Sequence, residues 1–184
     1  MFTVVLDACV LIPPTLSDLV LRIAETGVYD VRWSAEILDE VQRHLGERGI
    51  PAGSVRSRVE AMRHAFPFAE VEAYEHLIPV LRNDPKDRHV LAVAIQSRTE
   101  TIVTFNERDF PADALAPWDV SVLGVDDFLS SQLDLAPGPV LAALHQLQMS
   151  YRRPPVPMQD ILGRLERSGV PQFTLDLRRR LNTH

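Results

Sequence analysis

The sequence is poor in several residue types on which particular kinds of site depend. It has one cysteine, Cys9, so an internal disulfide and a thiolate metal site are both excluded, and we expect Cys9 to be a small buried hydrophobe. It has one lysine, Lys86. No apolar run approaches membrane-spanning length, and no charged-then-apolar leader precedes Asp7. We therefore expect a cytoplasmic protein that does not associate with membranes.

Charge is unevenly distributed along the 184 residues. The formal net charge is −6, which argues against binding of nucleic acid through bulk electrostatics. Residues 150–184 nevertheless hold seven arginines against three acids, so this end is the better candidate for contact with phosphates or an acidic partner. A hydrophobic fraction of 46% and a charged fraction of 24% are typical of an ordinary globular protein.

Apolar periodicity predicts an alternation of strands and helices. Strands are expected at residues 2–6, 29–33, 68–71, 101–104 and 120–123, and helices at about 15–27, 34–45, 52–65, 84–95, 126–129, 140–151, 158–168 and 171–181. Such alternation favours an α/β fold with a central parallel sheet. Pro137-Gly138-Pro139 interrupts the chain, and only helices are expected after it. We predict a main domain at 1–130 and an all-helical C-terminal extension at 131–184.

Helix starts follow from capping residues. Thr15 or Ser17, Ser34 and Asp126 are predicted to cap helices. Asp84-Pro85 is typical of a helix start, with Asp at the cap and Pro in the first turn, which would put Asp87 in that turn as well.

Four carboxylates lie at the ends or flanks of the predicted buried elements. Asp7 directly follows the first strand, Asp109 follows the 101–104 strand, Asp87 lies near a helix start, and Glu40 borders the apolar face of its helix. In a parallel α/β fold such positions converge at the carboxyl edge of the sheet. Unpaired carboxylates repel one another, and hard divalent cations with oxygen ligands relieve that repulsion. Each residue alone also fits a solvated or capping role.

Neutral and secondary groups accompany these acids. Thr104 and Asn106 add hydrogen-bonding groups beside Asp109, and Asp84 precedes Asp87. Lys86, with the neighbouring arginines 88 and 108, fits either contact with substrate phosphates or simple charge compensation, so substrate-binding residues stay unassigned. A phospho-acceptor receiver domain would need a lysine late in the sheet, which Lys86 is not.

Residues 1 to about 130 resemble the PIN-domain family of metal-dependent ribonucleases, which includes VapC-like toxins. The resemblance rests on VVLDACVLI around Asp7, WSAEILDEV around Glu40, DPKDRHVLAVA around Asp87 and IVTFNERDF around Asp109. It implies a three-layer α/β/α fold in which Asp7, Glu40, Asp87 and Asp109 are catalytic and hold Mg²⁺ or Mn²⁺, with Thr104, Asn106 and Asp84 supporting. Cys9 departs from the Asn, Ser or Thr of many members, which questions a secondary polar contact there.

The resemblance also implies an activity and partners. The expected activity is endonucleolytic cleavage of RNA by a metal-activated water, as the toxin of a type II toxin–antitoxin module. The expected partners are an RNA substrate, a cognate antitoxin and a second copy of the chain in a homodimer. Two alternatives stay open: a non-catalytic PIN-like module that binds RNA or protein, and an RNA-processing nuclease outside a toxin system.

Overall fold

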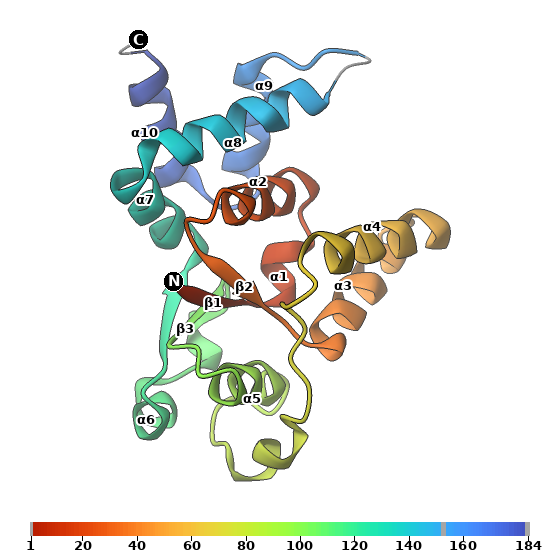
Figure 1. The fold of residues 1–184 in the computed structure, drawn as a ribbon, viewed down its shortest axis with the longest axis vertical. Helices are drawn as coiled ribbons and strands as arrows, with labels where there is room; N and C mark the ends of the chain where they lie inside the picture. The colour runs from red at the N-terminus through yellow and green to blue at the C-terminus, as the bar shows by residue number, and fades with distance from the viewer. Residues whose placement is uncertain (1, 152–153, 183–184) are drawn as a thin grey trace. The chain divides into compact units, whose positions relative to one another are not determined.

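A computed structural model describes residues 2–151 and 154–182, which form two compact units (Figure 1). The sheet unit consists of Phe2–Ile12 and Asp30–Leu123. The helical unit consists of Pro13–Tyr29 and the described residues from Gly124 onward. A segment from near the N-terminus therefore belongs with the C-terminal helices, and the predicted domain boundary after residue 130 stays a prediction.

The core of the sheet unit is a sheet with strand order β2-β1-β3-β4, formed by Asp30–Arg32, Thr3–Leu6, Thr101–Thr104 and Ser121–Gly124. The central strand β1 pairs in parallel with β2 and with β3. Val4, Val5 and Leu6 are fully buried, as a continuous apolar strand in a parallel sheet requires. The predicted α/β class with a central parallel sheet is confirmed.

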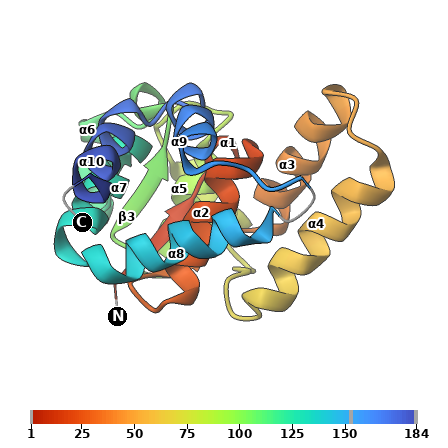
Figure 2. The same cartoon turned by 90° about the horizontal axis from the view of Figure 1, so that it is seen from above.

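Helices of the sheet unit are α1 (Ala8–Leu11), α3 (Ala35–Glu47), α4 (Ala52–Ala65), α5 (Arg88–Gln96) and α6 (Ala112–Leu115), with short 3₁₀ turns η1 (Glu75–Val80), η2 (Glu107–Asp109) and η3 (Ala116–Trp118). The helices α3 and α4 pack side by side as a hairpin (Figure 2). The Ser34 side chain accepts a hydrogen bond from Ile37 N, which confirms its predicted capping role. Residues 68–71 form only an isolated bridge, between Trp33 and Glu70.

The predicted helix start at Asp84-Pro85 is wrong, because α5 begins at Arg88. Residues 84–87 form a turn in which Lys86 N donates to the Asp84 carboxylate and Asp87 N donates to the Asp84 carbonyl. Asp followed by Pro suits such a turn as well as a helix start, and here the side-chain hydrogen bond stabilises the turn. Asp87 is consequently the residue before the helix and not part of its first turn.

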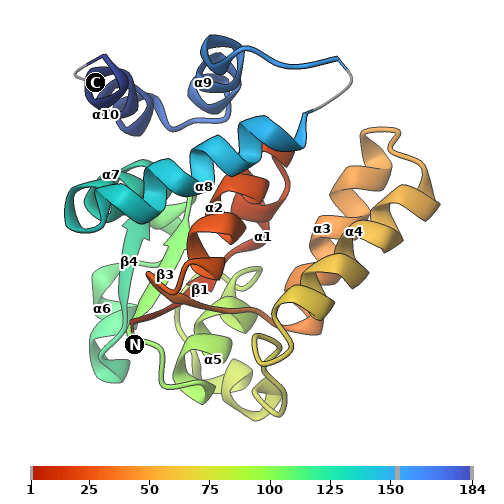
Figure 3. The same ribbon diagram turned by 45° about the horizontal axis from the view of Figure 1, so that its top comes forward.

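The helical unit contains α2 (Pro14–Glu25), α7 (Val125–Leu135), α8 (Pro137–Ser150), α9 (Met158–Arg167) and α10 (Pro171–Leu181). In this unit α2 packs on α8 and α9, and α7 packs on α10 (Figure 3). Tyr29 lies in the core of this unit. Its ring packs edge-on against Phe128 with 5.0 Å between the ring centroids, and its hydroxyl donates to the Val20 carbonyl. The three predicted C-terminal helices are present, and no described helix is long and apolar enough to cross a membrane.

Both capping predictions in the helical unit, Thr15 or Ser17 for one helix and Asp126 for another, are wrong. Thr15 and Ser17 lie inside α2 and are buried, because the helix already begins at Pro14. Asp126 lies inside α7, and its carboxylate instead accepts hydrogen bonds from the amides of Gln172 and Phe173 in the first turn of α10. Local sequence could not reveal this bond, because it joins residues 46 and 47 positions apart.

Candidate active site

Asp7 and Thr104 meet at the carboxyl edge of the sheet, the edge at which β1 and β3 end. Asp7 follows β1, is 3% exposed, and donates its backbone amide to the Val103 carbonyl of β3. The fully buried Thr104 hydroxyl donates to Asp7 Oδ2 at 2.6 Å. A buried carboxylate needs such donors, because they replace the hydrogen bonds that it would make with water. The parallel pairing of β1 with β3 thus brings together two residues 97 positions apart in sequence.

Cys9 contributes to the same group of hydrogen bonds, contrary to its expected role as a buried hydrophobe. It is only partly buried, and its thiol donates to Asp7 Oδ2 at 3.3 Å and lies 3.4 Å from Thr104 Oγ1. Burial, followed by the charge of Asp7, raises the pKa of the Cys9 thiol to about 12. Cys9 therefore stays a neutral thiol. It makes a polar contact with Asp7, although many family members carry Asn, Ser or Thr at this position.

Asp87 lies near both Asp7 and Asp109. Asp84 N donates to the Asp109 carbonyl at 3.1 Å, which ties the turn before α5 to η2. The pKa of Asp87 is raised to about 6. Burial is the largest cause of this rise, and the negative charges of Asp7 and Asp109 contribute to it. Beside the effect of burial, Asp87 is therefore near enough to Asp7 and to Asp109 for each of them to repel its negative charge.

Glu40 reaches the same region from α3. It is half-buried at the border of the apolar face, and burial raises the pKa of its carboxyl, with the charge of Asp7 acting in the same direction. The neighbouring His89 acts against this rise in the pKa of Glu40, and its Nε2 atom lies 3.8 Å from Glu40 Oε2. Asp7, Glu40, Asp87 and Asp109 are called the acidic quartet below: Asp7 influences both Glu40 and Asp87, and Asp109 influences Asp87.

The remaining predicted residues have more limited roles in this geometry. Asn106 is exposed, and it is its backbone amide, 3.0 Å from Thr104 Oγ1, that joins the hydrogen bonds at the carboxyl edge. Asp84 uses its carboxylate in the turn at Lys86. Arg88 donates to the Asn83 carbonyl, so its guanidinium stabilises the chain before α5.

Sequence reasoning missed two buried polar residues that flank Asp87 in the chain. His89 is 4% exposed and Asn83 is 2% exposed, and His89 Nε2 and both polar atoms of the Asn83 side chain have no hydrogen-bond partner in the described structure. A histidine two positions after Asp87, at the head of an otherwise apolar helix, was the available signal for the first.

The acidic quartet does not form a closed coordination shell. Among residues 2–151 and 154–182, no three His, Cys, Asp or Glu side chains are arranged so that they could hold a metal ion as they stand. The four acids are therefore near enough to influence the charge of at least one other member, but their oxygens are not arranged around a single metal position.

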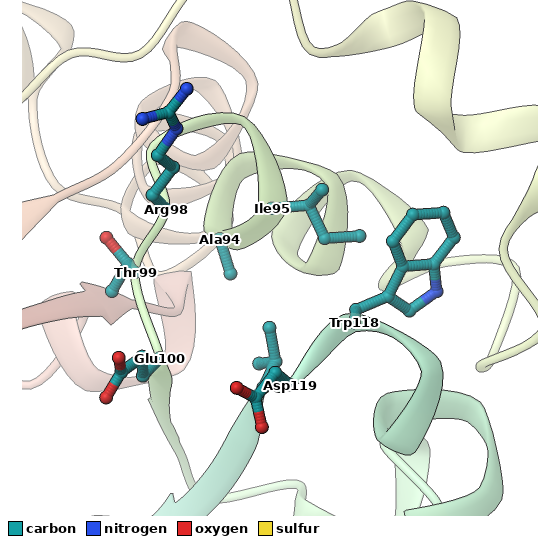
Figure 4. A pocket seen from close by; sticks show the side chains of 8 residues that line it. Ala94, Ile95, Arg98, Thr99, Glu100, Trp118 and Asp119 are labelled. Carbon is teal, nitrogen blue, oxygen red and sulfur yellow. The ribbon is translucent and has the colours of Figure 1, made fainter.

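A hollow of about 220 Å³ lies at the opposite edge of the same sheet (Figure 4). It is lined by residues around the end of α5 and the starts of β3 and β4, among them Arg98, Glu100 and Trp118. Glu100 precedes β3, whereas Thr104 ends it, so the length of the strand separates this hollow from the acidic quartet.

Buried Asp and Thr lie at the carboxyl edge of a parallel sheet, with further acids around them. Comparison with models of protein families identifies the class of protein that has this arrangement. The chain belongs to the PIN-domain family: the model described as PIN domain matches residues 3–108, and a model described as VapC50 C-terminal domain matches residues 125–179. The predicted family and its α/β/α fold with C-terminal helices are confirmed.

One relative adds detail to this assignment. The chain is 42% identical over 135 residues to the Mycobacterium tuberculosis (strain ATCC 25618 / H37Rv) protein named "Putative ribonuclease VapC50". The aligned region covers 73% of this chain and 76% of that protein. No solved structure matches the chain.

Proposed function

We propose that this protein is an endoribonuclease that depends on Mg²⁺ or Mn²⁺, with Asp7, Glu40, Asp87 and Asp109 as the catalytic acids that hold the ion. The observation that carries the proposal is the placing of Asp87 beside Asp7 and Asp109, where burial, followed by the negative charges of these two acids, raises the pKa of Asp87 to about 6. Carboxylates held in this way without a cation are costly, so they favour the binding of one.

The donor set fits a hard divalent cation. Carboxylate oxygens are the ligands that Mg²⁺ and Mn²⁺ prefer, and the thiol of Cys9, with a pKa of about 12, does not compete as a soft thiolate ligand. When bound, such an ion lowers the pKa of a water molecule and stabilises the charge of in-line attack on a phosphodiester. The quartet must draw together to bind it, because its oxygens do not yet share a point.

The residues of the chain would prepare this site in distinct ways. Thr104 Oγ1 donates to Asp7 Oδ2 and fixes the orientation of that buried carboxylate. The Cys9 thiol adds a second, weaker donor to the same oxygen. Asp87 releases its proton near pH 6, so binding of a cation below that pH would be coupled to proton release. Asn106 and Asp84 are proposed to support the loops that carry Asp109 and Asp87.

We further propose that the protein is the toxin of a type II toxin–antitoxin module, with RNA as substrate, a cognate antitoxin as partner and a homodimer as its assembly. Support comes from the match of both segments of the chain to PIN and VapC50 models and from the name of the mycobacterial relative. The cytoplasm is the expected location of such a module.

The first test is cleavage of a structured RNA pool by purified protein with Mg²⁺, with Mn²⁺ or with a chelator. We expect cleavage only with metal, and its loss in Asp7→Asn. The matched control is Asp113→Asn, because Asp113 is an exposed acid of the same unit outside the quartet. Tight RNA binding without cleavage under any metal would replace this proposal with the non-catalytic alternative.

The toxin proposal has its own test. Induced expression in bacteria should arrest growth with the wild-type chain and with Asp113→Asn, but not with Asp7→Asn. Co-expression of a small DNA-binding protein encoded beside the gene should restore growth and form a stable complex. Metal-dependent cleavage without growth arrest would instead favour an RNA-processing nuclease.

A further inference from the structure

His89 is the polar residue of the sheet unit that the proposed mechanism leaves unexplained. It is the second residue of α5, where it is followed by the buried run Val90–Ala94. Its side chain is 4% exposed, and its Nε2 atom is buried without a hydrogen-bond partner in the described part of the chain. Buried polar groups without a partner are rare in native proteins, and each one calls for a reason.

The nearest anion gives that reason. Glu40 Oε2 lies 3.8 Å from His89 Nε2, which is beyond hydrogen-bond distance but within reach of a small rotation of the glutamate. The Glu40 side chain is 26% exposed, so it has more room to rotate than the imidazole, which is 4% exposed. An ionised carboxylate only accepts hydrogen bonds, so the Nε2 atom must be the donor.

We infer that His89 is a positioning residue for Glu40: its Nε2–H donates to the Glu40 carboxylate when that carboxylate turns inward to bind the cation. This inference rests on the proposed function. Glu40 has the longest side chain of the quartet and stands on α3, apart from the strand ends that fix Asp7. A rigid donor on α5 restricts its rotation and directs its other oxygen.

The alternative contact of Glu40 does not serve this purpose. Arg43 lies 3.9 Å from Glu40 Oε1, but it stands on the same helix and its side chain is 61% exposed. A flexible exposed arginine three residues away fixes little. His89 instead joins α3 to α5, and hydrogen-bond donors placed behind a metal ligand in this way typically orient the ligand and strengthen metal binding.

Three substitutions separate donation from simple filling of space. His89→Gln places an amide N–H near the position of Nε2. His89→Asn keeps an amide of similar polarity but is one methylene too short to reach Glu40. His89→Leu keeps apolar volume without any donor. Thermal melting and circular dichroism identify variants that fail to fold, and the Gln and Asn pair keeps the comparison valid if Leu is among them.

The measurements are Mn²⁺ binding by calorimetry, made on the protein without RNA, and kcat and KM for cleavage with Mn²⁺. We expect His89→Asn and His89→Leu to weaken Mn²⁺ binding by about 10- to 100-fold, and to lower kcat more than they raise KM. His89→Gln should restore most of both properties. In a Glu40→Gln background, the change from His89 to Asn should alter Mn²⁺ binding by less than about twofold, because the shared interaction is already lost.

Other outcomes overturn the inference. Unchanged Mn²⁺ affinity in a folded His89→Asn variant would do so, as would equal losses in the Gln and Asn variants, or full additivity with Glu40→Gln. Failure of the proposed function is a separate outcome: the wild-type chain would then neither bind Mn²⁺ nor cleave RNA. The inference about His89 would be rejected as well. Metal-dependent cleavage by wild type with a silent His89→Asn rejects the role of His89 alone.

Discussion

In the helical unit, carboxylates on one helix meet arginines or backbone amides of another, whereas at the carboxyl edge of the sheet unit they meet one another. Arg180 lies 2.6 Å from Asp134, and Arg178 lies 2.7 Å from Glu166. Asp126 accepts from two amides at the start of α10, where the helix dipole also favours a negative charge. The charges of this unit are used to join helices.

Charged side chains are arranged differently at the carboxyl edge of the sheet unit. Asp7 is buried beside Thr104, and Asp87 bears the repulsion of both Asp7 and Asp109. From another element, the imidazole of His89 faces Glu40, with Nε2 3.8 Å from Oε2. Acids that are paired in the helical unit but gathered at the carboxyl edge of the sheet unit indicate that stability is given up for binding at that edge, since perturbed electrostatics of this kind cluster at functional sites.

The largest effect is expected from Thr104→Val, which removes the hydroxyl donor of Asp7 at nearly constant volume. The Asp7 carboxylate then stays buried without its 2.6 Å partner, so we expect a loss of about 1–3 kcal/mol in the free energy of unfolding. Activity with Mn²⁺ should fall by about 10- to 100-fold. Chemical denaturation and initial cleavage rates measure the two effects.

The control for this prediction is Thr101→Val. Thr101 begins the same strand and is also buried, but its hydroxyl lies 3.4 Å from Ser121 Oγ at the other edge of the sheet. If both valine variants lose the same activity, Thr104 acts through the strand and not through Asp7.

These residues also show what sequence could supply. Asp7 and Thr104 were predictable because a strand end is a position defined by local pattern, and parallel pairing then brings two such ends together. Glu40, Asp87 and Asp109 were also selected by their positions at the flanks of predicted elements, but each alone fits a solvated or capping acid, and the family resemblance supplied their catalytic roles. The roles of these residues stay predictions, whereas Glu40 and Asp87 are observed near Asp7, and Asp109 near Asp87.

What sequence could not supply depends on side-chain direction or distant partners. The Cys9 thiol was expected to be apolar, because nothing local reveals that it points at Asp7 and Thr104. His89 was overlooked because its partner stands on another helix. The start of α5 was misplaced because Asp84-Pro85 suits both a turn and a helix, and only the hydrogen bond of Lys86 N decides between them.

Asp126→Ala tests the corresponding contact of the helical unit. The carboxylate holds two amides at the start of α10, so its removal should cost about 1–2 kcal/mol and raise hydrogen exchange in the first turn of that helix. Asp127→Ala is the matched control, because Asp127 is an exposed acid in the same first turn of α7. Equal losses would assign the effect to the α7 dipole and not to the bond with α10.

Asp87→Asn should stabilise the metal-free protein at neutral pH. The pKa of Asp87 is about 6 in the folded state and about 4 in an unfolded chain. The folded state therefore binds more protons between these values, and the stability of the wild type in chelator should fall as pH rises from about 4 to about 6. The Asn variant should lose this dependence and melt a few degrees higher at neutral pH.

The same series has a second arm with Mn²⁺ present. The ion should raise the melting temperature of the wild type more than that of Asp87→Asn, because the variant has lost one ligand and the repulsion that the ion relieves. A variant that is less stable than wild type in chelator at neutral pH would contradict the view that Asp87 is under electrostatic strain.

The smallest effect is expected from the Arg180–Asp134 ion pair. The pair is short, at 2.6 Å, but 36% and 75% of the two side chains are exposed, so water and salt screen the attraction. A double-mutant cycle of Arg180→Met and Asp134→Asn should give a coupling of about 0.2–1 kcal/mol that shrinks with added salt. A coupling that exceeds the cost of Asp126→Ala and resists salt would reverse the ranking, and ion pairing between side chains would then contribute more to the joining of α7 and α10 than the carboxylate that binds backbone amides.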